Sequence, residues 1–187
     1  MKKILAIAAM ALLTLTASAQ KLGRVNFTEL YQLMPEADAA REQINAMQNE
    51  AQETYASMVE EYQKKVDQYQ QKQASWTAAI RESKEKELYD IQNRIQEFQQ
   101  SVSQDLQQQQ SLLMTPIMEK AQKAVQDLAK AQGIIAVFDS GSALYFDENA
   151  VVDLTAAARK SLGIKEGRTL EQLSQELQAA AQAAQAQ

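Results

Sequence analysis

The sequence predicts a mainly α-helical protein with a small β body, in which a long antiparallel helical hairpin arm is attached to a short-stranded sheet. The first observation is that neither glycine nor proline occurs between Glu36 and Thr115, where Gln, Glu, Lys and Ala predominate. These residues are adequate to good helix formers, and no helix breaker interrupts them. The second observation is that short segments of strand-like composition precede and follow this span. The arm is therefore expected from one continuous segment, and the body from segments on both sides of it.

The first 19 residues have the features of a secretory signal peptide. Met1-Lys2-Lys3 is followed by an apolar run from Ile4 to Leu15 and by the small residues Ala17-Ser18-Ala19. The run covers 12 residues, fewer than the roughly 18 to 20 that a membrane-spanning helix needs. Cleavage after Ala19 is expected, and the mature protein is predicted to be exported and soluble.

The arm is predicted from an apolar repeat. Residues 20–34 are expected to form the first strand of the body, at Leu22–Phe27, and an entry turn, and residues 35–132 the arm. Within the arm, apolar residues follow a 3-4-4 spacing that repeats every 11 residues. The clearest triplets are Ile44, Met47 and Ala51, then Tyr55, Met58 and Tyr62, and then Val66, Tyr69 and Gln73. An 11-residue repeat has a period of about 3.67 residues per turn, which predicts little or slightly right-handed supercoiling.

The apolar phase does not show whether the arm turns back on itself. Counting on from Val66 reaches, without a break, Thr77, Ile80, Lys84 and Leu88. A continuous rod over residues 35–132 would be roughly 150 Å long and would hold the flanking strands far apart. Short isolated strands are marginal in water, so a hairpin that returns the chain to its origin is favoured.

The turn of the hairpin is predicted near residues 73–78. The apolar seam becomes polar at Gln73, Thr77 and Lys84, and either Ser75 or Thr77 is a suitable cap for a second helix. This position divides the arm into a descending helix of about 40 residues and a returning helix of about 55 residues.

Residues 133–163 are predicted to complete the body. Ile134–Asp139 and Ala143–Phe146 have the composition of two strands, joined by the turn Asp139-Ser140-Gly141-Ser142. A closing helix, capped by Asp153 or Thr155, is expected to end before Gly163. The apolar residues assigned to the sheet and to an oligomerisation core are Val25, Phe27, Ile135, Val137, Leu144 and Phe146. Residues 164–187 form an Ala/Gln-rich tail that is predicted to be partly disordered.

Composition argues against catalysis and against binding of nucleotide or nucleic acid. Histidine and cysteine are both absent, which removes the commonest general base, the usual transition-metal ligands and the thiol nucleophile. The five glycines form neither a P-loop nor a G-x-G-x-x-G turn. Loss of the leader removes two of the 19 basic residues, and the 24 acidic residues then exceed the basic ones by seven, which disfavours nucleic acid. We expect no enzyme, no cofactor, no metal site and no nucleotide or nucleic-acid partner.

Several segments follow one another along the chain in a distinctive order. They are the signal peptide, Gly23–Phe27, the Gln/Lys/Glu-rich arm, Leu113–Ile117, Gly133–Asp139 and Val152–Thr155. In this order they resemble the Skp (OmpH-like) family of periplasmic chaperones. The resemblance implies a homotrimer whose three helical arms surround a cavity that takes unfolded outer-membrane β-barrel proteins. The best-known member is strongly basic whereas this chain is acidic, so no membrane or lipopolysaccharide docking site is carried over.

Five residues near the expected tip are candidates for contact with an unfolded client, because methionine and aromatic side chains make adaptable apolar surfaces. They are Trp76, Met58, Tyr62, Tyr69 and Tyr89. The alternative for Met58, Tyr62 and Tyr69 is that they pack the seam between the helices. Trp76 lies at the expected turn, where an indole has little seam to fill, so client contact and packing of the tip both stand as interpretations.

Two functions remain open at this point. The leading hypothesis is an ATP-independent periplasmic holding chaperone for unfolded outer-membrane or envelope proteins. The alternative is a structural or adaptor coiled-coil rod of the cell envelope that binds no unfolded client.

Overall fold

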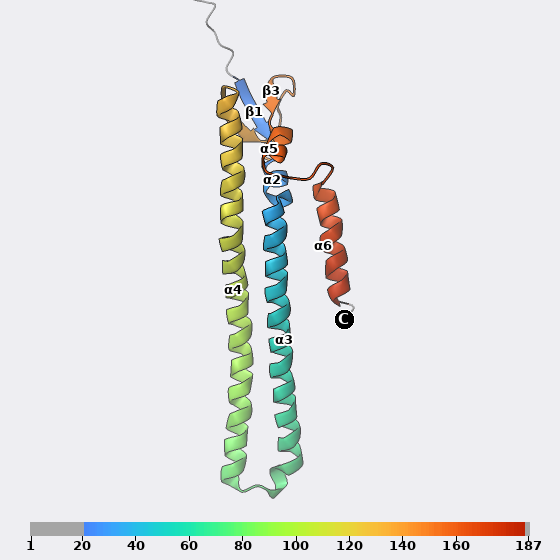
Figure 1. Cartoon of the computed structure of the whole chain (residues 1–187). Helices are drawn as coiled ribbons and strands as arrows, with labels where there is room; N and C mark the ends of the chain where they lie inside the picture. Colours follow the sequence, from blue (N-terminus) through green and yellow to red (C-terminus); the bar gives the residue numbers. More distant parts are fainter. Residues whose placement is uncertain (1–20, 186–187) are drawn as a thin grey trace, which may run out of the picture. The chain divides into compact units, whose positions relative to one another are not determined.

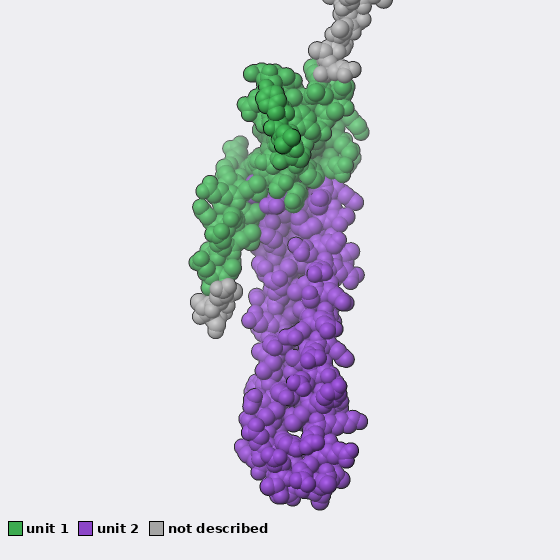
Figure 2. Space-filling model, turned by 180° about the vertical axis from the view of Figure 1, so that it is seen from behind, with its two compact units in different colours: residues 1–31, 120–187 green, residues 32–119 purple. Residues whose placement is uncertain are grey.

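The computed structural model describes residues 21–185, so the predicted signal peptide at residues 1–19 lies outside the described residues. The described chain divides into two compact units (Figure 2). The first contains the described residues up to Tyr31 and those from Lys120 onward, and the second contains Gln32–Glu119. The first unit is thus assembled from two segments that are distant in the sequence, whereas the second is one continuous segment.

The first unit contains a three-stranded sheet whose strands are all parallel (Figure 1). β1 is Lys21–Val25, β2 is Ile134–Asp139 and β3 is Val151–Asp153, and the order across the sheet is β2-β1-β3. The central strand carries Gly23, which lies opposite Val137 on one side. A Cβ atom at Gly23 would lie 3.2 Å from Ile134 Cγ2 and 3.3 Å from Val137 Cγ2. Glycine at this position therefore leaves room for the side chains of β2.

The predicted strand at Ala143–Phe146 is wrong, and the third strand of the sheet is Val151–Asp153 instead. A tight turn after β2 would create an antiparallel neighbour, whereas β2 and β3 are both parallel to β1 and lie on opposite sides of it. Residues 140–150 must therefore cross from one edge of the sheet to the other. The turn predicted at the start of this segment does form, because Ser142 N donates to Asp139 O at 3.2 Å and Gly141 N donates to Asp139 Oδ1 at 3.2 Å.

The first strand also ends earlier than predicted, because Phe27 begins helix α2, Phe27–Leu33. Asn26 caps this helix through its side chain, which accepts from Glu29 N at 3.1 Å. The backbone N–H of Asn26 donates to Thr155 Oγ1 at 3.0 Å, and that of Phe27 donates to Asp139 Oδ1 at 3.1 Å. A side chain from the end of β2 and one from just after β3 thus satisfy the backbone N–H groups at the junction of β1 and α2.

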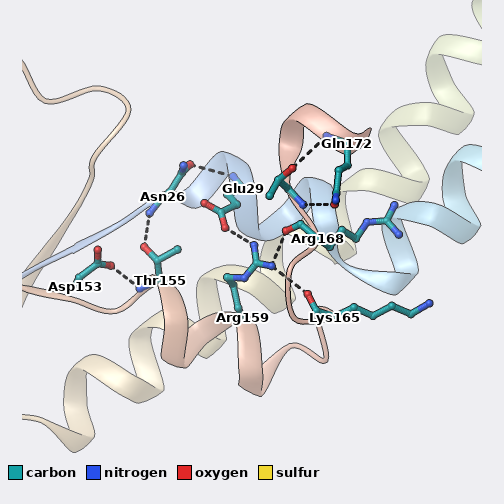
Figure 3. A network of polar contacts seen from close by, with 9 residues as sticks. Asn26, Glu29, Asp153, Thr155, Arg159, Lys165, Arg168 and Gln172 are labelled. Atoms are coloured by element: carbon teal, nitrogen blue, oxygen red, sulfur yellow. Dashed lines mark hydrogen bonds and ion pairs between the residues drawn. The ribbon is translucent and has the colours of Figure 1, made fainter. Parts of the chain in front are cut away.

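A polar network centred on Arg159 joins the C-terminal elements of the first unit (Figure 3). Arg159 lies in α5, Thr155–Ser161, which begins where Thr155 N donates to Asp153 Oδ1 at 2.8 Å. Its guanidinium pairs with Glu29 and also donates to Lys165 O at 3.1 Å and to Arg168 O at 2.7 Å. One arginine therefore links α2, α5 and the loop that leads to the last helix.

The last helix, α6, is Leu170–Gln185 and covers most of the segment predicted as an Ala/Gln-rich tail. A reciprocal capping box starts it, in which Thr169 N donates to Gln172 Oε1 at 3.1 Å and Gln172 N donates to Thr169 Oγ1 at 3.2 Å (Figure 3). Leu173, in its first turn, is buried.

The core of the first unit is small and wholly apolar among the described residues. Leu30, Ala121, Leu154 and Ala158 are completely buried, so α2, α4 and α5, with the residue that precedes α5, supply its centre. Its other buried members are Val25, Val125, Ala129, Ile134, Leu162, Ile164 and Leu173. The core therefore draws on every element that the first unit contains except β3.

The second unit is a hairpin of two long antiparallel helices (Figure 1). α3 is Pro35–Lys72 and α4 is Ala78–Ala131, of which the residues from Lys120 belong to the first unit. Between them lies the short 3-10 helix η2, Gln73–Ser75. The helical span is therefore not a continuous rod. Long helices together with a small sheet confirm the predicted fold class.

Candidate functional site

The seam of the hairpin follows the 11-residue repeat. On α3 the apolar residues of that repeat are half-buried, and the polar residues between them are exposed except for Lys65. Few residues of the second unit are buried. On α4 between Ala78 and Glu119, the buried residues are only Ile91 and Ile117. The hairpin thus has a shallow seam, and most of the surface of both helices is exposed to solvent.

Charged and polar contacts join the two helices near the tip. Lys65 of α3 pairs with Glu87 of α4, and Lys84 also reaches Glu87 at 2.7 Å. Further from the tip, Glu61 of α3 lies 3.7 Å from Arg94 of α4. These contacts show which residues of the two antiparallel helices lie opposite each other. Sequence reasoning did not find them, although reflecting the chain about a turn near residue 75 would have placed Lys65 close to Glu87.

The turn at the tip is closed by local hydrogen bonds. Ser75 Oγ donates to Lys72 O at 2.8 Å, and Trp76 N donates to Gln73 O at 3.3 Å. Thr77 caps α4, because Thr77 Oγ1 accepts from Ile80 N at 3.4 Å and Thr77 O accepts from Arg81 N at 3.0 Å. Of the two suggested caps, Thr77 is therefore the one used.

The candidate contact residues occupy three different environments. Met58, Tyr62 and Tyr69 are half-buried in the seam of α3. Trp76 is also half-buried, and its ring packs edge-on against Tyr69 with 5.7 Å between the ring centroids. Tyr89 lies on α4 and is 63% exposed, which places it outside the seam. The structure brings Tyr69 and Trp76 together and leaves Tyr89 open to solvent.

Tyr69 connects the aromatic pair to the other helix. Its hydroxyl donates to the Glu85 carboxylate, and this bond raises the pKa of Tyr69 above its ordinary value. A cavity of about 250 Å³ lies beside Trp76, lined by Lys65, Gln68, Lys72, Trp76, Lys84, Glu87 and Leu88. At the tip, the indole of Trp76 therefore contacts the Tyr69 ring and also lines this cavity.

Charge is distributed unevenly along the hairpin. Between residues 64 and 87 there are six Lys or Arg residues and four Asp or Glu residues. In the remainder of residues 36–119 there are eleven acidic residues and only two basic ones, Arg41 and Arg94. The shaft is therefore acidic and the tip slightly basic.

The pairing at the tip shifts the ionisation of its members. Hydrogen bonds from Lys65 and then from Lys84 lower the pKa of Glu87 below its ordinary value of 4.5, and the bond to Glu87 raises the pKa of Lys65. On α3 itself, Lys64 lowers the pKa of Glu60 in the same way. Since the folded pKa of Glu87 is lowered, the pairing stabilises the tip above pH 4.5 and is lost as the pH falls through the lower, folded value.

We expect the fluorescence of Trp76, the single tryptophan of the chain, to report this loss in acid. Its emission should change with a midpoint below pH 4.5. Glu87→Gln should give the acid-state emission already at neutral pH and abolish the transition. Glu60→Gln is the matched control, since it removes only a pair within α3. A transition that persists unchanged in Glu87→Gln would contradict this account of the tip.

The residues assigned to an oligomerisation core are dispersed over the first unit. Val25 is buried in β1, and Phe27, Val137 and Phe146 are half-buried. Ile135 is 60% exposed on β2, and Leu144 is fully exposed in the crossing segment. In β2 the residue that enters the core of the unit is Ile134, which sequence reasoning missed because both isoleucines fit the strand pattern equally well.

The comparison with protein families gives a match over residues 21–162, to the family described as outer membrane protein (OmpH-like). This match spans the three strands, both helices of the hairpin and α5. The chain belongs to the OmpH-like family. The resemblance seen in the sequence is thereby confirmed. No curated protein matches the chain.

Membership of the OmpH-like family indicates the general role and compartment. The family is one of periplasmic chaperones for outer membrane proteins and is not enzymatic. Its match ends at Leu162, so α6 lies beyond the part of the chain that defines an OmpH-like protein. Within residues 21–185, no helix is long and apolar enough to cross a membrane.

Proposed function

We propose that the chain is an ATP-independent holding chaperone of the periplasm that encloses unfolded outer-membrane or envelope proteins between helical arms and prevents their aggregation. In this proposal the working form is a homotrimer, and the signal peptide at residues 1–19 directs export. The observation that carries the proposal is the hairpin itself, built from helices of 38 and 54 residues with a shallow seam. Such an element has little core of its own and offers a long, exposed surface.

Holding without ATP follows from many weak contacts made at once. Each exposed apolar or amide side chain contributes little, but several arms around one cavity raise the effective concentration of binding groups near a client. The surface of the hairpin suits this task because glutamines and charged residues dominate it and apolar groups are scattered among them. Tyr89, at 63% exposure, is the candidate best placed to contact a client directly.

The other candidate contacts divide according to their environment. We assign Trp76 both roles, packing of the tip and contact with a client, because its ring packs on Tyr69 while the residue remains half-exposed. Met58, Tyr62 and Tyr69 are proposed to act mainly by packing the seam, and to contact clients only through their exposed edges.

Because Tyr89 is exposed on α4, Tyr89→Ser should weaken client holding without altering the helical content of the chain.

The test is suppression of client aggregation by the mature protein. An unfolded outer-membrane protein is diluted from urea, and its turbidity is followed with increasing amounts of the chain. We expect suppression to saturate at a fixed stoichiometry and to be unaffected by ATP. Aggregation that proceeds undiminished at excess protein would overturn the proposal and favour a structural or adaptor role in the envelope.

A further inference from the structure

Helix α6 is covered by the rest of the described chain only in its first turn. Leu170 there is half-buried and Leu173 is buried, whereas residues 174–183 are all exposed. The apolar stripe of the helix nevertheless continues past Leu173, because Leu177, Ala180 and Ala181 follow at spacings of three or four residues. Leu177 is 44% exposed. The later turns of α6 therefore present an apolar stripe that the described chain leaves uncovered.

A groove with an apolar floor lies on the same unit, where the last part of α4 meets the end of α5. Its volume is about 420 Å³, and it is lined by Lys120, Lys123, Ala124, Asp127, Leu128, Ser161 and Leu162. Ala124 and Leu128 are half-buried and Leu162 is 4% exposed, so these three side chains form the floor. None of the described residues of α6 lines the groove. The last helix of the chain thus leaves its own groove unfilled.

The stripe and the groove match in length and in shape. The groove follows one face of α4 over residues 120–128, which rise by about 12 Å, and the stripe from Leu177 to Ala184 rises by about 10 Å. Leu177 is the one large apolar side chain among residues 174–183. Ala124 is the smallest side chain of the floor, so a leucine can insert beside it as a knob enters a hole. The alanines of α6 then allow the two helices to approach closely.

Charge favours a second copy of the chain as the occupant of the groove. The polar rim carries Lys120 and Lys123 against one acidic residue, Asp127. Residues 170–187 carry Glu171 and Glu176 and neither lysine nor arginine. An acidic helix thus meets a rim of net positive charge, which guides the pairing of the two surfaces. A lipid surface is a poor partner for α6, because helices that lie on membranes carry basic residues on their polar face.

The loop before α6 holds the helix away from the groove of its own copy. Arg159 donates to Lys165 O at 3.1 Å and to Arg168 O at 2.7 Å, so this loop is fixed at two points (Figure 3). Leu173 is then buried at the start of the helix. Moving α6 into its own groove would break both bonds of Arg159 and expose Leu173. The α6 of another copy reaches the groove at neither cost.

We propose that the later turns of α6 of one copy dock in the groove between α4 and α5 of a second copy, with Leu177 inserted beside Ala124. The contact is made by helices alone and leaves the sheet as it is. The inference rests on the self-association included in the proposed function. It adds to that association a contact made by a helix that lies beyond the family match.

Engineered cysteines test this contact directly, because the chain has no cysteine of its own. The full-length mature chain with Ala124→Cys is mixed with a chain of different mass that carries Leu177→Cys, and the mixture is unfolded, refolded together and oxidised. Each chain has a single cysteine, so a disulfide must join two copies. We expect the mixed disulfide to be the main product. Gln175→Cys is the matched control, since it lies on the opposite face of α6 and should give at least fivefold less of it.

Three outcomes of the cross-linking would overturn the proposal. The first is an equal yield of mixed disulfide from Gln175→Cys and Leu177→Cys. The second is a predominance of disulfides between two Leu177→Cys chains, which would mean that α6 packs on α6. The third is internal closure of a chain that carries both Ala124→Cys and Leu177→Cys, which would mean that α6 occupies its own groove.

Hydrogen exchange tests the same contact without cysteines. A short isolated helix is marginal in water, so protection of its amides requires a partner. In the assembled parent chain we expect the amides of residues 174–183 to be protected. In Leu177→Ser they should exchange at least tenfold faster, whereas Gln175→Ser should match the parent. Circular dichroism checks that both variants keep their helices.

The proposal fails if the parent is a monomer or if residues 174–183 exchange in its assembly as they do in Leu177→Ser. Client holding is scored separately by the aggregation assay. An assembly that gives the mixed disulfide but holds no client contradicts the proposed function alone. An assembly that holds clients but gives no mixed disulfide above the control contradicts this inference alone.

Discussion

A chain that lacks residues 47–57 and 97–107 is expected to fold and to self-associate like the parent, but to lose most of its capacity to hold long clients. Each deletion removes one 11-residue repeat, which corresponds to about three helical turns and rotates the remaining seam by only about 20°. The two segments lie opposite each other in the antiparallel register that the pairs Glu61–Arg94 and Lys65–Glu87 indicate. Both of these contacts, the turn at Gln73–Ser75 and the whole sheet are retained.

The loss of holding follows from geometry. Each helix becomes about 16 Å shorter, so any cavity between arms loses depth and contact surface. We expect several-fold more protein to be needed to suppress aggregation of a long client, and a smaller effect on a short one. The measurement is the aggregation assay with clients of two lengths, together with light scattering for the assembly state.

The control is a pair of deletions that break the phase. Removing eight residues from each helix rotates the seam by roughly 80° and should unfold the hairpin even though less of the chain is lost. A shortened, in-phase chain that holds long clients as well as the parent does would show that arm length is not what limits holding.

The arm could be predicted from the sequence because its signal is periodic and local. The positions Ile44, Met58 and Tyr62, which follow the 3-4-4 spacing, are the ones that the structure half-buries. The location of the turn could not be derived from that spacing, since the phase continues through Thr77. It is settled by the cap at Thr77 and by the cross-helix pairs, which depend on where the chain turns.

The sheet was harder to predict because its partners are remote in the sequence. β1 pairs with residues more than 100 positions away on both of its sides. Strand direction is decided by these partners and by the crossing segment and not by local composition. Composition alone therefore predicts a strand at Ala143–Phe146, whereas the strand forms at Val151–Asp153. The ion pair between Arg159 and Glu29 could not be predicted for the same reason, because the two residues are far apart in the sequence.

The largest loss of stability from a single truncation is expected for Leu154→Ala. Leu154 is completely buried, and it stands between β3 and α5, where its backbone N–H donates to Arg24 O at 2.9 Å. Truncation to alanine removes three carbon atoms from a core that has few large members, so its neighbours have little means of filling the cavity. We expect a decrease of about 3 kcal/mol in the free energy of unfolding.

The control is Val152→Ala, two residues earlier on the exposed side of β3, which should lower the free energy of unfolding by less than about 1 kcal/mol. The measurement is denaturant unfolding at one fixed protein concentration, because self-association adds to apparent stability. Equal losses for the two variants would mean that Leu154 does not hold α5 to the sheet, and that the body depends on assembly more than on its own core.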